Sequence, residues 1–226
     1  MNLASRTGAW SDKPLPYLRR VAYLESSGTQ RINTGYSPLS TSVFGVKFSV
    51  LSVSYYTRWG LVYGAYGTDD PRTDCQLGFA NDQNYLRIYN RFCVPTNFSP
   101  DYLQTSIGTI YDVVAKKGRM SVNGNFYNQG VGPDNPNSDL IHLFGSSVDV
   151  SYRYFIGRIF YWNVRDEEDG DLVKDFVPVL DLTGRPCMYD QVMSSVPADD
   201  SSRFHYNIGT GEFGWEEIDG TVVPPQ

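Results

Sequence analysis

The chain has 226 residues and a formal net charge of −6 at pH 7. Hydrophobic residues make up 41% of it, which is enough for a packed core and excludes a wholly disordered chain. The acidic balance excludes nucleic acid as a partner, because binding phosphates requires a cationic surface.

Short strands separated by turns are predicted from Arg20 onward. In residues 43–53, apolar side chains occupy every second position from Phe44 to Val50, as in a strand buried on one face. Further strands are expected at residues 58–66, 76–80, 85–90, 106–116, 119–122, 140–145, 155–165, 172–179, 187–189 and 203–206. No stretch has a sustained 3.6-residue period, so helices should be short or absent.

Two dipeptides predict β-hairpins. Asn123-Gly124 follows the strand at 119–122, and Asp169-Gly170 joins the strands at 155–165 and 172–179. In the strand at 155–165, the alternate residues Phe160, Trp162 and Val164 are predicted to face the core together. Many short strands with such turns indicate a two-sheet sandwich.

The three cysteines, Cys75, Cys93 and Cys187, cannot all pair within the chain. We expect them to be small buried apolar side chains, with a Cys75–Cys93 disulfide between neighbouring strands as the alternative. None forms a CxxC pair and both histidines, His142 and His205, are isolated, so no structural zinc site is expected. His142 lies in an apolar strand and is expected to be structural.

The start of the chain differs from the rest. Residues 1–19 are polar and proline-rich, and are expected to form an N-terminal tail or attachment strap to a domain spanning 20–226. No apolar run reaches the ~20 residues that cross a bilayer, so no membrane insertion is expected. No apolar central region of a secretory signal is visible either.

Two regions near the chain ends carry a family resemblance. One is residues 23–36 (YLESSGTQRINTGY), and the other combines 172–179 (LVKDFVPV), 184–190 (GRPCMYD) and 206–213 (YNIGTGEF). Together they resemble the concanavalin A-like lectin/glucanase superfamily, in particular the LamG-like domains of surface and phage-encoded proteins of gut bacteria. The resemblance implies an all-β, two-sheet antiparallel jelly-roll sandwich with its first and last strand regions adjacent. It also implies a location outside the cell, on the cell surface or in a phage virion.

The sequence does not predict an enzyme. Glycosidases of this superfamily carry paired carboxylates on one strand face. Here Glu217-Ile218-Asp219 gives an incomplete ExD pattern, beyond the expected last strand. The acidic residues Glu167, Glu168, Asp169 and Asp171 are expected to be a solvated hairpin tip.

We expect non-catalytic carbohydrate binding, for surface recognition or adhesion, with a glycan or surface polysaccharide as partner. A sugar site needs aromatic rings and polar side chains in one place. The predicted ligand-binding residues are Trp59, Tyr63, Tyr66, Asp69, Asp70 and Asp74. The resemblance implies in addition one Ca²⁺ near a sheet edge, and Asp69, Asp70, Asp74 and Asp82 are the expected oxygen donors. No other cofactor is expected.

The alternative is a structural or assembly domain of a phage tail or cell-surface fibre that binds no sugar. Residues 1–16 would then dock onto a larger particle, with Trp10 as an apolar anchor. Both functions are compatible with a homo-oligomer or a larger fibre or tail assembly.

Overall fold

The computed structural model describes residues 15–52, 59–66, 73–82, 85–95, 103–128, 139–147, 154–192, 200–220, 222–223 and 225. Within these ranges the chain forms two antiparallel sheets, and the helical structure is one 3-10 turn, η2 (Asp200–Arg203). No helix in the described part of the chain is long and apolar enough to cross a bilayer. The predicted all-β class is confirmed.

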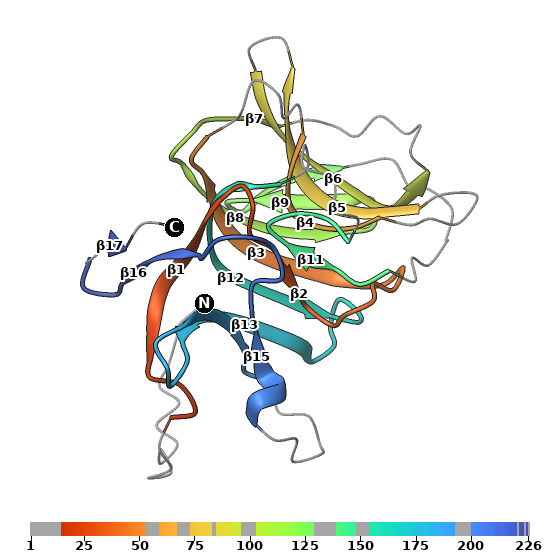
Figure 1. Ribbon diagram of the computed structural model, residues 1–226. Coiled ribbons are helices and arrows are strands. Elements are labelled where there is room, and N and C mark those ends of the chain that lie inside the picture. The colour runs from red at the N-terminus through yellow and green to blue at the C-terminus, as the bar shows by residue number, and fades with distance from the viewer. Residues whose placement is uncertain are drawn as a thin grey trace.

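The described strands form a larger sheet A and a smaller sheet B (Figure 1). Sheet A contains β1 (Arg19–Ser27), β3 (Val43–Val50), β8 (Ile110–Lys116), β9 (Arg119–Val122), β10 (Asn125–Asn128), β12 (Ile156–Arg165), β13 (Leu172–Leu180), β14 (Pro186–Asp190), β15 (Phe204–His205), β16 (Gly214–Glu217) and β17 (Val222–Val223). Sheet B contains β2 (Ile32–Asn33), β4 (Trp59–Tyr66), β5 (Thr73–Asp82), β6 (Tyr85–Pro95), β7 (Leu103–Thr105) and β11 (His142–Leu143).

The chain passes repeatedly from one sheet to the other. It leaves sheet A after β3, forms the meander β4–β5–β6–β7 in sheet B, and returns for the meander β8–β9–β10. Strand β3 therefore lies between β8 and β12, two strands that are distant from it in the sequence. These crossings between two antiparallel sheets confirm the predicted jelly-roll sandwich.

The predicted strands are confirmed in type, with ends that move by a few residues. One prediction about the end of the chain is wrong, because Glu217 does not lie beyond the last strand. It is the final residue of β16, which pairs with β1 in sheet A. The strand was missed because Gly214–Glu217 has one apolar residue and no alternation.

The predicted hairpin at Asn123-Gly124 is present. Asn123 has φ of 49° and Gly124 has φ of 83°, and two successive positive φ values are typical of the two-residue turns that suit twisted strands. The turn pairs β9 with β10 and places Phe126 directly opposite Ser121.

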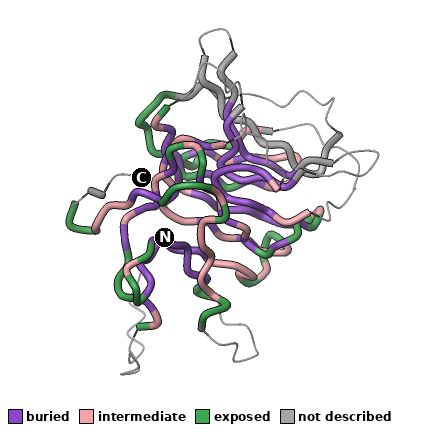
Figure 2. Tube along the Cα trace, in the orientation of Figure 1, coloured by how far each residue is buried: buried purple, intermediate pink, exposed green. Residues whose placement is uncertain are grey.

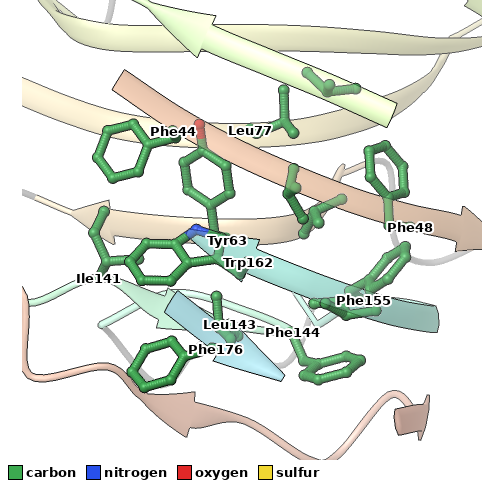
Figure 3. Close-up of a cluster of buried hydrophobic side chains, with 14 of the residues drawn as sticks. Phe44, Phe48, Tyr63, Leu77, Ile141, Leu143, Phe144, Phe155, Trp162 and Phe176 are labelled. Atoms are coloured by element: carbon green, nitrogen blue, oxygen red, sulfur yellow. The ribbon is translucent and has the colours of Figure 1, made fainter. Parts of the chain in front are cut away.

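The core lies between the two sheets and is rich in aromatic rings (Figures 2 and 3). Trp162 stacks on Phe176 with ring centroids 5.4 Å apart, and Phe44 packs against Trp162 at 5.9 Å. Tyr63 of sheet B contacts Phe44 at 5.1 Å, so these rings join the sheets directly. Ring pairs at such separations add about 0.5–1.5 kcal/mol each beyond the area they bury.

One residue that was predicted for the core lies on the opposite face of its strand. Trp162 and Val164 are fully buried in the core, as expected, but Phe160 is half-buried and packs on Tyr23 at 5.4 Å. The register of β12 against β3 shifts between Ile159 and Tyr161. This irregularity reverses the alternation along β12, as a β-bulge does, and so turns Phe160 outward.

The buried cysteines and His142 follow the prediction. Cys75 and Cys187 are fully buried, and the backbone partner of Cys75 on β6 is Phe92 rather than Cys93. His142 is also buried, and its Nδ1 lies 3.1 Å from the carbonyl oxygen of Leu140.

The first and last strand regions are adjacent, as predicted. The Thr210 amide donates to the Thr29 carbonyl at 3.1 Å, and the Ile208 amide donates to the Arg31 carbonyl at 2.9 Å. Between them, a Cβ atom on Gly209 would lie 2.0 Å from the Thr29 carbonyl oxygen, so this close approach requires glycine. The two segments that carried the family resemblance therefore bind to each other.

Gln30 completes this contact from inside the fold. It is fully buried, and its Oε1 accepts from the Ser26 hydroxyl and the Ser27 amide, both at 2.9 Å. Its Nε2 donates to the Glu212 carbonyl at 3.1 Å. One side chain thus forms hydrogen bonds with polar groups of both the turn after β1 and the segment before β16.

Replacement of Gln30 tests this role. We expect Gln30→Leu to lower the free energy of unfolding by about 2–4 kcal/mol, because it leaves several buried polar groups without partners. The exposed Gln191 provides the control, and Gln191→Ala should change stability by less than about 0.5 kcal/mol. Urea denaturation measures both, and equal stabilities for the two variants would contradict the role given to Gln30.

Candidate functional site

The predicted aromatic site does not form one surface. Trp59 and Tyr66 are the two end residues of β4, and an extended strand separates them by about 23 Å. Trp59 is opposite Ala80, whereas Tyr66 is opposite Asp74, so the register sets two of the predicted residues, Tyr66 and Asp74, side by side. A monosaccharide cannot contact both ends of the strand at once.

Tyr63 is excluded from any ligand-binding surface, which corrects the prediction. It is fully buried and packs against Phe44 and Trp162 between the sheets (Figure 3). Burial raises the pKa of its hydroxyl well above the ordinary value. The hydroxyl has no hydrogen-bond partner among the described residues.

The predicted calcium ligands are also separated. Asp74 and Asp82 lie at opposite ends of β5, about 26 Å apart, whereas oxygens around one calcium ion lie within 2.3–2.6 Å of it. These two residues therefore cannot share an ion. Asp69 and Asp70, which were predicted for both the sugar and the calcium site, lie outside the described residues. Among described residues, no group of three or more acidic, histidine or cysteine side chains could bind a metal.

A different site lies on the outer face of sheet A, the face that points away from the core. A hollow of about 300 Å³ opens there over the β8–β9–β10 meander and the ends of β3 and β12. We call it the outer hollow. Its lining residues are Val43, Val114, Lys116, Arg119, Ser121, Phe126, Arg165 and Glu168.

Strand alternation produces this lining. In β9, Met120 and Val122 are buried in the core, so Arg119 and Ser121 point outward. In β8 the same rule buries Val113 and leaves Val114 45% exposed. Register then sets Val114 beside Ser121, and Ser121 beside Phe126.

Phe126 is the aromatic group of the outer hollow. It lies on β10, at the end of the strand order of sheet A, and is 65% exposed. The guanidinium carbon of Arg119 lies 3.9 Å from the centre of its ring, which is a cation–π contact. The site therefore combines an exposed ring with a cation oriented by that ring.

The charges of the outer hollow are mostly positive. Lys116, Arg119 and Arg165 line it, against the single carboxylate of Glu168. Glu168 forms an ion pair with Lys116, and this hydrogen-bonded partner holds the pKa of Glu168 below its ordinary value. The acidic hairpin tip was predicted to be solvated, and Glu168 is exposed as expected, but it also pairs with Lys116.

Sequence reasoning missed the outer hollow for a specific reason. Phe126 follows a turn and lies in no predicted strand. Arg165 ends a predicted strand, and Glu168 belongs to the predicted acidic tip. The signal was present in the alternation of β8 and β9 and in the Asn-Gly turn, which together place Phe126 on the outer face. The approach of the β12–β13 hairpin to β8 depends on sheet order, which alternation does not reveal.

A second hollow, of about 390 Å³, lies near the β13–β14 turn. Its lining includes Asp181, whose carboxylate accepts from Thr183, Arg185 and Tyr206. Burial raises the pKa of Asp181, but these hydrogen bonds outweigh it and leave that pKa below the ordinary value. The Tyr206 ring already contacts Phe204 and the Arg185 guanidinium. Asp181 and Tyr206 therefore already have partners within the protein.

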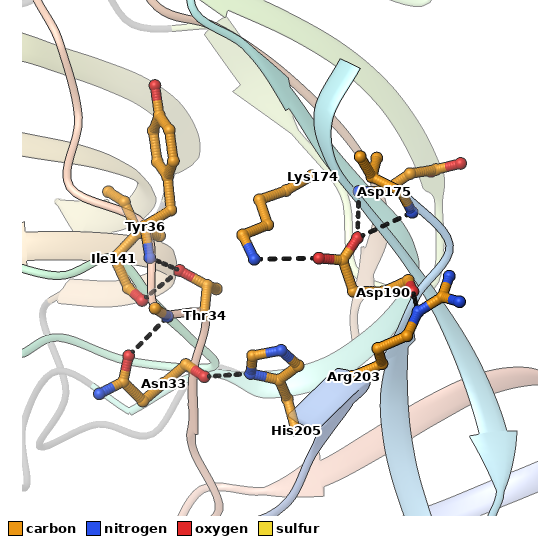
Figure 4. A network of polar contacts seen from close by, with 11 residues as sticks. Asn33, Thr34, Tyr36, Ile141, Lys174, Asp175, Asp190, Arg203 and His205 are labelled. Carbon is orange, nitrogen blue, oxygen red and sulfur yellow. Dashed lines mark hydrogen bonds and ion pairs between the residues drawn. The ribbon is translucent and has the colours of Figure 1, made fainter. Parts of the chain in front are cut away.

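A polar network joins β13, β14 and η2 (Figure 4). The buried Asp190 carboxylate lies 3.0 Å from Lys174 Nζ and accepts the amides of Asp175 and Val192, each at 3.1 Å. Arg203 donates to the Asp190 carbonyl at 2.7 Å. Burial, together with the neighbouring Asp190 charge, raises the pKa of Asp175. These groups fix the backbone rather than face an open hollow.

His205 extends this region across to sheet B. Its Nδ1 lies 2.9 Å from the Asn33 carbonyl oxygen, and since a carbonyl only accepts, Nδ1 carries the hydrogen (Figure 4). Its ring packs on Phe176 at 4.6 Å. Burial lowers the pKa of His205, and the nearby Lys174 charge lowers it further.

Comparison with protein-family models and with curated proteins gave no match. Among solved structures, the native heptameric SAP-like pentraxin of Limulus polyphemus is similar, with a TM-score of 0.47 and 12% sequence identity. The similarity covers 66% of this chain and 77% of that chain. It is a likeness of fold and transfers no ligand or site.

The burial of Tyr63 leads to a prediction about stability. Tyr63→Phe removes a buried hydroxyl that has no partner in the described structure, so the free energy of unfolding should stay unchanged or rise by about 1 kcal/mol. Tyr36→Phe is the matched control, because the Tyr36 hydroxyl donates to Asp166 at 2.7 Å. It should lower stability by about 1.5–3 kcal/mol in urea denaturation. Equal losses in both variants would show that the Tyr63 hydroxyl has a partner.

The lowered pKa of His205 predicts a pH dependence of stability. The unfolded chain binds a proton at higher pH than the folded protein, so stability should fall as the pH drops below about 6.5. His205→Gln retains a donor for the Asn33 carbonyl and removes the titration. Urea denaturation at pH 7.5 and 5.5 should show a smaller loss for the variant, while the remaining His142 keeps its own share. The same loss in both proteins would rule out this contribution.

Proposed function

We propose that the protein is a non-catalytic carbohydrate-binding domain that binds its glycan in the outer hollow. The observation that carries the proposal is the 65% exposure of Phe126 beside Arg119, Ser121 and Arg165. Sugars stack an apolar ring face on aromatic side chains while their hydroxyl groups bond to polar ones. Both kinds of group line one hollow here.

The expected affinity is modest. One exposed ring and a few hydrogen bonds in an open site suit a dissociation constant on the order of 0.1–1 mM. Firm attachment would then require several copies acting together, because linked sites bind with much higher avidity. We therefore propose that the domain acts within an oligomer, fibre or tail.

The arrangement of carboxylates supports a binding role rather than hydrolysis. Glycosidases need two carboxylates about 5–10 Å apart across the scissile bond. Among the described residues the outer hollow has one, Glu168, and it is paired with Lys116. Elsewhere Glu25 is paired with Arg158.

The resemblance to LamG-like, concanavalin A-like domains supports the same function, and with it a location outside the cell or in a virion. An assembly role is the second candidate. It is favoured by Leu15 and Leu18, which are 58% and 53% exposed near the start of the described chain, and by Leu182 in the β13–β14 turn, which is 70% exposed. Exposed apolar groups of this kind are common in contact surfaces between proteins.

A glycan array on the purified domain, followed by calorimetry on the best ligand, tests the proposal. Phe126→Ala should weaken binding about three- to tenfold, because it removes the stacking surface. Ile218→Ala removes an equally exposed apolar side chain elsewhere and should leave binding unchanged. An array without any bound glycan would contradict the function, and binding unaffected by Phe126→Ala would contradict the location.

A further inference from the structure

We infer that the ligand of the outer hollow is an acidic glycan, whose carboxylate is bound by Arg119 and Arg165. This inference rests on the proposed function and specifies its substrate class. It follows from the net charge of the hollow and from the contacts that each cationic side chain makes there.

The charge of the hollow differs from that of the protein. The chain has a net charge of −6, whereas three cations and one carboxylate line this site. Like charges repel one another, so grouping cations at one exposed hollow costs free energy unless an anion compensates them. Glu168 compensates Lys116 through their ion pair. Glu168 also interacts electrostatically with Arg119, so one carboxylate is shared among the cations and a net positive charge is left to face the ligand.

Arg119 is oriented for an anion. Its guanidinium lies over the Phe126 ring at 3.9 Å, which engages the flat face of the group and leaves its N–H edge for other partners. Stacking also restricts the side chain before the ligand arrives, so less conformational entropy is lost on binding. The ring and the guanidinium thus form one preorganised surface.

Arg165 faces the same hollow from β12. Its backbone partners are Val43 on β3 and Leu172 on β13. The Asp175 carboxylate of β13 is near enough to interact electrostatically with it, but no ion pair joins the two among the described residues. A guanidinium binds a carboxylate through two parallel hydrogen bonds, and such charged bonds are stronger than neutral ones. Ser121 and Phe126 complete a site for a sugar ring that carries a carboxylate.

The test compares a galacturonate oligosaccharide with its methyl ester, in which each carboxylate is neutralised by a methyl group. Calorimetry at low salt should show the acid binding at least tenfold more tightly. Arg119→Gln and Arg165→Gln should each weaken binding of the acid roughly tenfold and leave the ester nearly unchanged. Arg185→Gln, at the exposed β13–β14 turn, is the control and should change neither. High salt should weaken the binding of the acid and leave the binding of the ester unchanged.

Each other outcome has a defined meaning. Equal binding of acid and ester, lost in Phe126→Ala, would overturn the acidic ligand and retain the carbohydrate-binding function. If a sulfated oligosaccharide bound in an arginine-dependent way and the galacturonate did not bind, the assignment of a carboxylate as the bound acidic group would be overturned. Failure of every glycan to bind would overturn both the inference and the proposed function. Circular dichroism of each variant separates lost binding from lost folding.

Discussion

The structure depends on the contact between the two ends of the domain. The amides of Ile208 and Thr210 donate to the carbonyls of Arg31 and Thr29, and the buried Gln30 between them has both ends of its side-chain amide bonded. The contact fixes β1, which pairs with β12, β13 and β16 and so lies near the middle of sheet A. Strand β12 in turn presents Arg165 to the outer hollow. The most recognisable motifs of this sequence therefore support the fold, and the proposed binding residues lie elsewhere.

The irregularity in β12 connects the core to the outer hollow. Before it, Ile159 faces the core, and after it Trp162 and Val164 do. Uninterrupted alternation from Ile159 would turn Arg165 inward, among the aromatic rings, where a charge is costly to bury. The extra residue keeps Trp162 in its stack with Phe176 and leaves Arg165 on the outer face. One local change of register thus serves packing and charge placement together.

Much of the fold could be predicted from the sequence, because alternation and turn residues are local signals. They located most strands, the hairpin at Asn123-Gly124 and the sandwich class. The candidate site could not be predicted in the same way. Trp59, Tyr63 and Tyr66 are close in sequence, but a strand extends by about 3.3 Å per residue and alternates its faces, so they diverge. The outer hollow instead joins residues from five strands and one turn, and only sheet order brings them together.

The contact between the ends also affects how the chain can fold. Its hydrogen bonds join Thr29 to Thr210 and Gln30 to Glu212, which are 181 and 182 positions apart. Contacts at such separation require closure of a very long loop and are associated with slow folding. During synthesis, β1 emerges early and must wait for its partner β16 until nearly the whole domain has been made. In that interval its apolar side chains, Leu24 among them, depend on the other strands or on chaperones for cover.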